Sequence, residues 1–298
     1  MNNFMTVKNI LKLIRPEQWI KNLFIFLPLF FSGQLVGWDK WYACLPVFIA
    51  FSLVSSSIYC FNDIRDREED RLHARKKKRP IASGAISVKE GYVLMFLLLI
   101  PACLVLLLPG VENLWHVLGI LLFYYLLNMA YCLKLKNISI IDIFVIAGGF
   151  VLRLLSGGYA SDIQLSHWII LMTFLLALFL ALGKRRDDIR IYEKTGMTVR
   201  GNIRFYNIPF LNTVLGMLST ISVICYIMYA VSDEVTGRFG SDSIYLTSVF
   251  VLAGFIRYLQ VVLVEKGNAD PTYILLHDRF LQLCILGWLV SFALIIYF

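Results

Sequence analysis

Residues 91–109 read GYVLMFLLLIPACLVLLLP, an apolar run without a single charged side chain. A helix that crosses the hydrocarbon core of a bilayer needs about 20 such residues. Comparable runs lie elsewhere in the chain, at 22–37, 42–61, 114–132, 138–158, 166–183, 208–231, 243–264 and 280–298. Long apolar runs are typical of helical membrane proteins, whereas membrane barrels show alternation. We therefore predict an all-α polytopic fold of about nine transmembrane helices.

The composition of the 298-residue chain supports this class of protein. Hydrophobic residues make up 59% and charged residues only 16% of the sequence, and the mean hydropathy is +0.72. These values exclude a water-soluble globular domain and a disordered chain. The six cysteines show no metal-ligand or disulfide spacing. Because no linker-like or low-complexity segment interrupts the sequence, we expect one domain over residues 1–298.

The basic residues predict the orientation in the membrane. If the predicted spans alternate in direction, 24 of the 28 Lys and Arg residues lie on the side of the N-terminus. Only Lys40 and Arg238 lie in loops on the other side, and Arg153 and Arg257 lie inside spans. The positive-inside rule then places the N-terminus in the cytoplasm and the C-terminus outside. We expect an integral multi-pass protein of a bacterial inner membrane, in contact with membrane lipid and without a nucleic-acid partner.

A short acidic motif follows the second apolar run. It reads Asn62-Asp63-Ile64-Arg65-Asp66-Arg67-Glu68-Glu69-Asp70. In a continuous helix the aspartates at 63, 66 and 70 share one stripe. Carboxylate oxygens suit Mg²⁺, which proteins often share with substrate phosphates. The alternative is a solvated acidic helix end that the neighbouring arginines balance.

A basic loop comes directly after this motif. It runs from Arg71 through Lys76 and Arg79 to Gly84. Cationic side chains beside a metal site can donate charge-assisted hydrogen bonds to a phosphate chain. The alternative is that the loop only sets topology or attracts anionic lipid. We predict phosphate binding for Arg71, Lys76 and Arg79.

Two further groups of polar residues lie near predicted span ends. Asp142, Gly149 and Arg153 share a helical stripe, which we expect to line a cavity open to the cytoplasm, with Tyr131 and Lys136 at its mouth. Gly148 and Gly149 would let another helix or a ligand approach closely. The second group, Lys184, Arg185 and Asp188, follows the run 166–183 and could hold a second phosphate. A structural salt bridge between Lys184 and Asp188 is the alternative.

These motifs together resemble a known family. The N-D-x-x-D-x-x-x-D form of residues 62–70 resembles the UbiA superfamily of membrane prenyltransferases. Further blocks resemble its decaprenyl-phosphate phosphoribosyltransferase branch: RPEQWIKN at 15–22, DRLH at 70–73, RPIASG at 79–84, LK at 135–136, Asp142, GFVLR at 149–153, GKR at 183–185, RY at 257–258 and DR at 278–279. The blocks are spread over nearly the whole chain.

The resemblance implies a Mg²⁺-dependent transfer of 5-phosphoribose from phosphoribosyl pyrophosphate to a polyprenyl phosphate. It implies metal binding by Asp63, Asp66 and Asp70, and a direct role in catalysis for Asp63, Asp66, Lys184 and Arg153. Substrate binding is then expected at Lys21, Asn22, Asn62, Arg71, Lys76, Arg79, Tyr131, Lys136, Asp142, Arg185 and Asp188.

The sequence departs from the family pattern at a few positions. Ala74 stands where phosphoribosyltransferase relatives have Pro, and Asp188 where they have Glu. Aromatic prenyltransferases of the superfamily carry a second acidic motif where this chain has the more cationic KRRDD at 184–188. An aromatic prenyltransferase that uses a prenyl diphosphate donor remains the alternative enzyme. A transporter is disfavoured, because the acids gather at span ends and not at the bilayer midplane.

Overall fold

A computed structural model describes residues 6–72, 76–195, 205–265 and 271–297. Every regular element in these ranges is helical, which confirms the all-α fold. Within these described ranges, eight helical segments are long and apolar enough to cross a membrane. They are Trp38–Arg65, Val88–Leu106, Leu114–Leu133, Ile141–Ala160, His167–Glu193, Ile208–Ala230, Ser243–Leu263 and Arg279–Ile296. All eight coincide with runs predicted from the sequence.

The run predicted at 22–37 folds differently from a single α-helix. It lies partly in a 3₁₀-helix, η1 (Pro16–Phe26), and partly in the short helix α2 (Leu27–Phe31). Pro28 cannot donate to a helical ladder, and Gly33, with φ 74°, ends the helix in the left-handed region. A 3₁₀-helix rises about 2 Å per residue and an α-helix about 1.5 Å, so residues 16–31 still extend about 30 Å. A ninth crossing therefore stays a prediction.

The described residues form two compact units. The first comprises Met1–Lys136 and Gly149–Leu165, and the second Asn137–Gly148 and Ser166–Phe298. The helix α7 (Ile141–Ala160) contributes to both. The prediction of a single domain stays a prediction.

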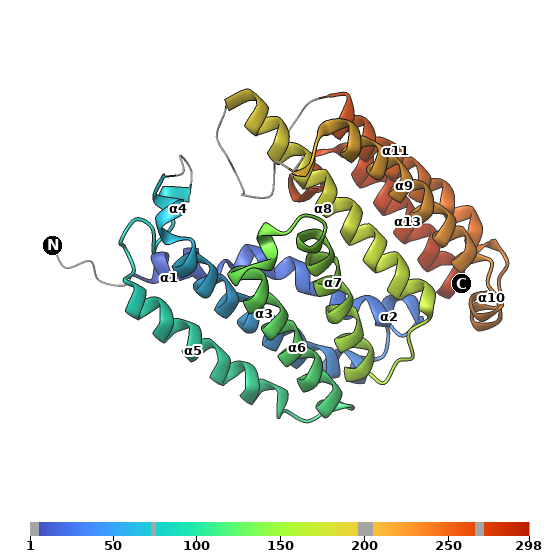
Figure 1. Cartoon of the computed structure of the whole chain (residues 1–298). Helices are drawn as coiled ribbons and strands as arrows, with labels where there is room; N and C mark the ends of the chain where they lie inside the picture. The colour runs from blue at the N-terminus through green and yellow to red at the C-terminus, as the bar shows by residue number, and fades with distance from the viewer. Residues whose placement is uncertain (1–5, 73–75, 196–204, 266–270, 298) are drawn as a thin grey trace. The chain divides into compact units, whose positions relative to one another are not determined.

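The first unit is built around the long helix α3 (Trp38–Arg65). It packs against α5 (Val88–Leu106) and α6 (Leu114–Leu133), as Figure 1 shows. Four serines of α3 are buried, namely Ser52 and, one turn later, the consecutive residues Ser55 to Ser57. Ser52 accepts a hydrogen bond from Asn22 Nδ2, and Ser56 accepts one from Trp19 Nε1, so these serines fasten η1 to α3.

One close backbone approach in this unit involves Gly157 of α7. A Cβ atom at this position would overlap the backbone carbonyl of Ile25 in η1. By contrast, a Cβ atom at Gly148 would meet nothing within 4 Å, and one at Gly149 would make ordinary contact with Tyr124. Close approach of a ligand to Gly148 or Gly149 stays a prediction. Gly157 was not singled out from the sequence, because residue type does not show which face of α7 is covered.

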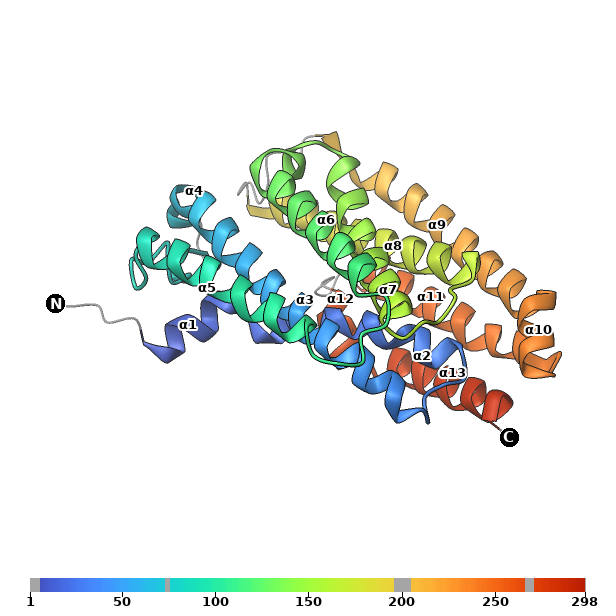
Figure 2. The ribbon, with the colours of Figure 1, turned by 90° about the horizontal axis from the view of Figure 1, so that it is seen from below.

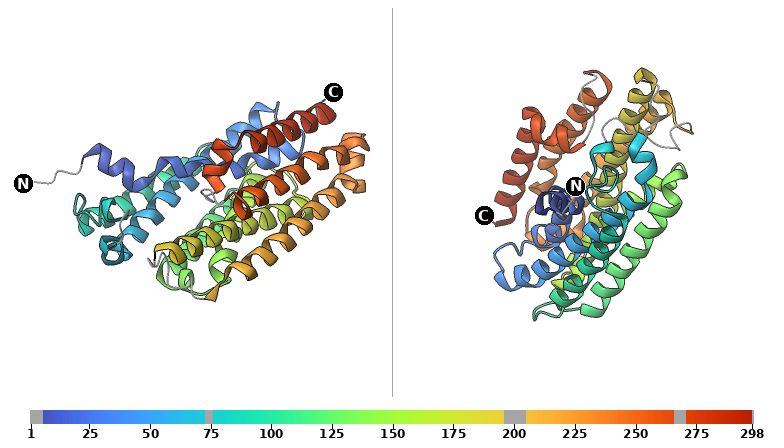
Figure 3. Two further views of the ribbon diagram at one scale, coloured as in Figure 1. Left: turned by 90° about the horizontal axis from the view of Figure 1, so that it is seen from above. Right: turned by 90° about the vertical axis from the view of Figure 1, so that its left-hand side faces the viewer.

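The second unit consists of long helices with short connecting helices. Helix α8 (His167–Thr195) packs on α9 (Ile208–Ala230), and α11 (Ser248–Leu263) packs on both α9 and α13 (Arg279–Tyr297). Figure 3 shows these yellow to red helices side by side. The short elements are α10 (Asp233–Phe239), η5 (Ser243–Thr247) and α12 (Pro271–His277). Phe179 of α8 meets Phe255 and Tyr258 of α11 in the interior.

Candidate active site

The acidic motif lies at the end of α3 and in the short helix α4 (Arg67–Leu72). The helix is interrupted at Asp66, which caps α3 with φ −87° and ψ 4°. Asp63 and Asp70 are almost fully buried, at 0% and 2% exposure. Their burial distinguishes them from Glu68 and Glu69, which are exposed. The stripe that the sequence predicted is thus a pair of buried carboxylates and one partly exposed carboxylate.

Arg79 joins the two buried carboxylates. Its Nη1 atom lies 2.6 Å from Asp70 Oδ2 and 3.2 Å from Asp63 Oδ1. The 3₁₀-turn η2 (Lys76–Lys78) precedes Arg79, and the backbone N–H of Arg79 donates to Lys76 O. The basic loop therefore folds back onto the acidic motif. This fold of the loop places Arg79 beside the carboxylates, where a phosphate site needs a cation. Phosphate binding by Arg79 stays a prediction.

Two more cations reach the motif from distant segments. Arg15, between α1 (Val7–Ile14) and η1, donates to Asp63 Oδ1 at 2.6 Å, and its guanidinium lies 4.9 Å from the centre of the Tyr59 ring. Lys136, in η3 (Leu135–Asn137), pairs with Asp66. Each aspartate of the motif therefore has a cationic neighbour. Arg15 lies in the block RPEQWIKN, but it was not predicted to be a site residue.

A divalent cation fits the buried pair of carboxylates. Asp63 Oδ2 is buried without a hydrogen-bond partner among the described residues. Mg²⁺ is usually held by one or two carboxylates together with waters and substrate phosphates. No group of three or more His, Cys, Asp or Glu side chains within the described ranges is arranged to share a metal ion. The donor set therefore fits a cation held by Asp63 and Asp70, and it does not show all three aspartates converging on one ion.

Arg153 lies inside a candidate span, and its hydrogen-bond partners among the described residues are neutral. Its Nε donates to Asn22 Oδ1 at 2.7 Å, its Nη1 to Gly149 O and its Nη2 to the Tyr124 hydroxyl at 2.8 Å. The guanidinium also lies over the Phe51, Tyr124 and Phe150 rings. The positive charge of the guanidinium is thus stabilised by the dipoles of its hydrogen-bond acceptors and by the faces of the aromatic rings. Asn22, which was predicted from the sequence to bind substrate, thus orients the Arg153 side chain through this hydrogen bond.

In the second unit, Asp142 is the centre of a buried network. Arg185 Nε donates to Asp142 Oδ2 at 2.7 Å, and Arg185 Nη1 donates to Asp188 Oδ2 at the same distance. The Tyr206 hydroxyl donates to Asp142 Oδ1 at 3.0 Å and accepts from the backbone N–H of Ile140. Asp142 and Arg153 thus have separate hydrogen-bond partners, and a cavity that both side chains line stays a prediction.

Tyr206 was missed by the sequence analysis. It stabilises the start of α7, where Ile140 has a positive φ of 69° that a β-branched residue seldom adopts. Burial raises the pKa of Tyr206 to about 12, so its hydroxyl remains protonated and can donate to Asp142. No motif in the sequence links position 206 to position 142.

The other predicted residues occupy varied positions. Arg71 is exposed and bonds to Glu68 and to Ala82 O. Lys184 is exposed on α8, and Lys21, Asn62, Lys76 and Tyr131 are partly buried. His73 and Ala74 of the loop lie outside the described residues. Asp188 pairs with Arg185, whereas the sequence had suggested Lys184 for this acid.

Arg257, the second arginine predicted inside a span, has a structural role. Its Nη2 lies 2.7 Å from Asp278 Oδ2, and its Nη1 lies 2.6 Å from Glu265 Oε1. Hydrogen bonds from Arg257 lower the pKa of Asp278. The RY and DR blocks of the sequence are thereby joined within one unit, between α11 and the start of α13.

Comparison with known proteins decides the family. The UbiA prenyltransferase family matches residues 23–283. The chain belongs to the UbiA prenyltransferase family. It is 35% identical to a decaprenyl-phosphate phosphoribosyltransferase of Mycolicibacterium smegmatis, over 98% of this chain and 93% of the relative. It is 33% identical to the Mycobacterium tuberculosis protein of the same name, over 96% and 93% of the two chains.

A solved structure agrees on the fold of this UbiA family member. The UbiA homolog from Archaeoglobus fulgidus bound to GPP and Mg²⁺ aligns with a TM-score of 0.69 at 19% identity, over 97% of this chain and all of that one. The resemblance stated from the motifs is confirmed, and the protein is a membrane-embedded transferase.

Proposed function

We propose that this UbiA family member transfers 5-phosphoribose from phosphoribosyl pyrophosphate to a polyprenyl phosphate. The observation that carries the proposal is the nearly full-length similarity to two decaprenyl-phosphate phosphoribosyltransferases. The cations at the acidic motif support it. Arginine side chains that pair with carboxylates can pair with phosphates in the same bidentate geometry.

In this proposal the acidic motif and its basic loop bind the pyrophosphate of the donor. Asp63 and Asp70 would hold Mg²⁺, with Asp66 as a further predicted ligand, and the metal would neutralise charge on the departing pyrophosphate. Arg79 joins both buried acids and is placed to exchange a carboxylate contact for a phosphate contact. Arg71 and Lys76, from the same loop, would bind the outer phosphate oxygens.

The acceptor needs a different kind of site, because its head group is itself an anion. Lys136, Arg153 and Lys184 are the candidates for this phosphate, and Arg185 is held by Asp142 and Asp188 in an orientation that a second phosphate could use. The phosphate oxygen forms a bond to C1 of ribose while the bond from C1 to the pyrophosphate oxygen breaks. The attacking oxygen is already ionised, so no side chain has to remove a proton.

The orientation of the protein in the membrane follows from the same proposal. The cytoplasm supplies phosphoribosyl pyrophosphate, so the acidic motif and the N-terminus face the cytoplasm, as the distribution of Lys and Arg predicts. Transfer of a prenyl group to an aromatic acceptor is the second candidate. The match of residues 23–283 to the UbiA prenyltransferase family as a whole favours it. Movement of radiolabel from phosphoribosyl pyrophosphate into extractable lipid tests the first candidate.

A further inference from the structure

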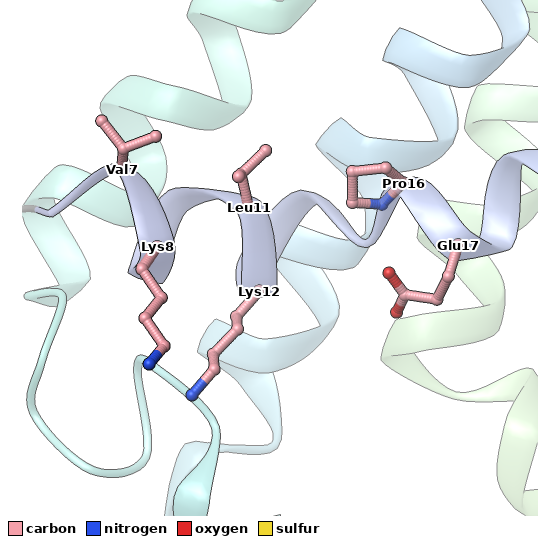
Figure 4. A pocket seen from close by; sticks show the side chains of 6 residues that line it. All are labelled: Val7, Lys8, Leu11, Lys12, Pro16 and Glu17. Atoms are coloured by element: carbon pink, nitrogen blue, oxygen red, sulfur yellow. The ribbon is translucent and has the colours of Figure 1, made fainter.

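Helix α1 exposes two neighbouring stripes of opposite character. Val7 and Leu11, one helical turn apart, are 72% and 48% exposed. Lys8 and Lys12, also one turn apart, are exposed beside them. Figure 4 shows the two apolar side chains projecting from one edge of the helix and the two lysines from the other. With Pro16 and Glu17 they line a hollow of about 650 Å³.

The opposite face of α1 is firmly attached to the first unit. Leu13 is fully buried in a hydrophobic cluster with Cys60 and Ile64 of α3. The Ser56 hydroxyl donates to Ile14 O at 2.8 Å. Thr6 caps the helix at its start, and Arg15 ends it in the left-handed region while binding Asp63. The orientation of the exposed stripes is therefore fixed by packing.

The contacts of Leu13 also define the position of α1 along the axis of α3. Cys60 and Ile64 belong to the last turns of α3, where this candidate span ends at Arg65. Figure 2 shows α1 near that end of α3, beside α4 and α5. An element at the end of a span lies at the level of lipid head groups. Apolar side chains at this level can enter the acyl region while lysines extend to the phosphates.

The lysines of α1 carry charge that the protein does not neutralise. Neither Lys8 nor Lys12 forms an ion pair with an acid in the part of the chain that the structure describes. Glu17 is the one acid that lines the hollow with them, so the hollow keeps a net positive charge. A cationic surface bordered by exposed apolar side chains is complementary to an anionic membrane surface.

We propose that α1 is an interfacial helix that binds anionic lipid, with Val7 and Leu11 in the acyl boundary and Lys8 and Lys12 on lipid phosphates. The inference goes beyond the transferase activity, because it concerns bulk anionic phospholipid and a surface on which no predicted substrate residue lies. It holds whichever donor and acceptor the enzyme uses.

The test uses the full-length protein in lipid nanodiscs. The single exposed cysteine, Cys103, is replaced by Ser, and Leu11→Cys is labelled with a polarity-sensitive fluorophore. Nanodiscs contain phosphatidylcholine with a graded fraction of phosphatidylglycerol. We expect a blue shift and protection from aqueous iodide as that fraction rises. A label at Glu69→Cys, on the charged helix α4, should remain in water throughout.

The lysines are tested with matched variants. The pair Lys8→Gln and Lys12→Gln should lower the equilibrium constant for burial of the label by about fivefold for each lysine removed, which moves the half-maximal shift to a higher phosphatidylglycerol fraction. Lys8→Arg with Lys12→Arg should retain the wild-type midpoint. Lys40→Gln, at the other end of α3, should also leave the midpoint unchanged.

Three results would overturn the proposal. The first is a label at position 11 that iodide quenches equally in all lipid mixtures. The second is a Gln pair whose midpoint equals that of Lys40→Gln. The third is a label that is shielded in pure phosphatidylcholine in proportion to protein concentration, which would show that a second copy of the chain covers α1.

Discussion

Arg185 Nε lies 2.7 Å from Asp142 Oδ2, and the two side chains are 1% and 0% exposed. Asp142 begins α7 and Arg185 lies far along α8, so this ion pair ties two helices of the second unit together. Tyr206 and Asp188 complete the hydrogen bonding of the pair. A buried pair of this kind is costly to break, because removal of Asp142 leaves the buried Nε of Arg185 without its carboxylate acceptor, even though Nη1 keeps Asp188.

Asp142→Asn should therefore lower the free energy of unfolding by about 3 kcal/mol. Thermal unfolding of the purified protein in detergent measures the loss. The control is Glu234→Gln, which removes an exposed ion pair with Arg238 and should change stability by less than about 1 kcal/mol. Equal melting of Asp142→Asn and the wild type would show that the pair does not stabilise the fold.

Tyr206→Phe removes a hydroxyl that accepts from Ile140 and donates to Asp142. We expect a loss of about 1 to 2 kcal/mol near neutral pH, since both groups lose a hydrogen bond. The pKa of Tyr206 is raised from 10.0 to about 12, so folding favours the neutral phenol. Its stabilisation is complete below pH 10 and is lost as the pH rises through about 12.

The stability difference between wild type and Tyr206→Phe should consequently shrink between pH 10 and pH 12. Tyr245→Phe, at an exposed tyrosine, serves as the matched control for the loss of a phenol hydroxyl. A difference that stays constant over this range would mean that the hydroxyl of Tyr206 does not titrate with unfolding.

Gly157→Ala and Gly148→Ala should have opposite effects, although both lie on α7. A methyl group at 157 would overlap the carbonyl of Ile25, which must then move at a cost of about 1 to 3 kcal/mol. A methyl group at 148 meets nothing within 4 Å, so the higher helix propensity of Ala should make this change neutral or slightly stabilising. Thermal melting of both variants checks the order, and equal melting temperatures of the two variants would show that η1 does not pack on α7 at Gly157.

Asp63→Asn should lower turnover by about 100-fold or more, because an amide is a poor ligand for a cation and leaves Arg15 without its carboxylate partner, while Arg79 keeps Asp70. Transfer to lipid measures the effect, and membrane insertion should be unchanged. Glu68→Gln, at an exposed acid of the same motif, should retain activity. Full activity in Asp63→Asn would refute the role of this carboxylate.

Much of the fold follows from hydropathy alone, since eight predicted runs coincide with helices. Apolar composition sets the length of a span but not its helix type, so the η1 and α2 segments were not anticipated. Nothing in the sequence indicates that the buried serines of α3 attach η1 to this helix. Their role depends on Asn22 and Trp19, which lie some 30 residues earlier in the chain.

The site was predictable only where its residues are close in sequence. The spacing of the motif selected Asp63, Asp66 and Asp70, and the adjoining loop selected Arg79. Contacts with Arg15, Lys136 and Tyr206 join segments that are 48, 70 and 64 residues apart. A single sequence carries no signal for such pairs, because residue type and spacing within one helix do not report tertiary contacts.

The central claim is the identity of the donor. Purified protein with Mg²⁺ and a polyprenyl phosphate is given radiolabelled phosphoribosyl pyrophosphate in one reaction. A parallel reaction contains a labelled prenyl diphosphate and 4-hydroxybenzoate, and Asp63→Asn is the blank for both. The account predicts label in the lipid phase from the sugar donor and no prenylated benzoate. Product in the second reaction alone would contradict phosphoribosyl transfer and would establish an aromatic prenyltransferase.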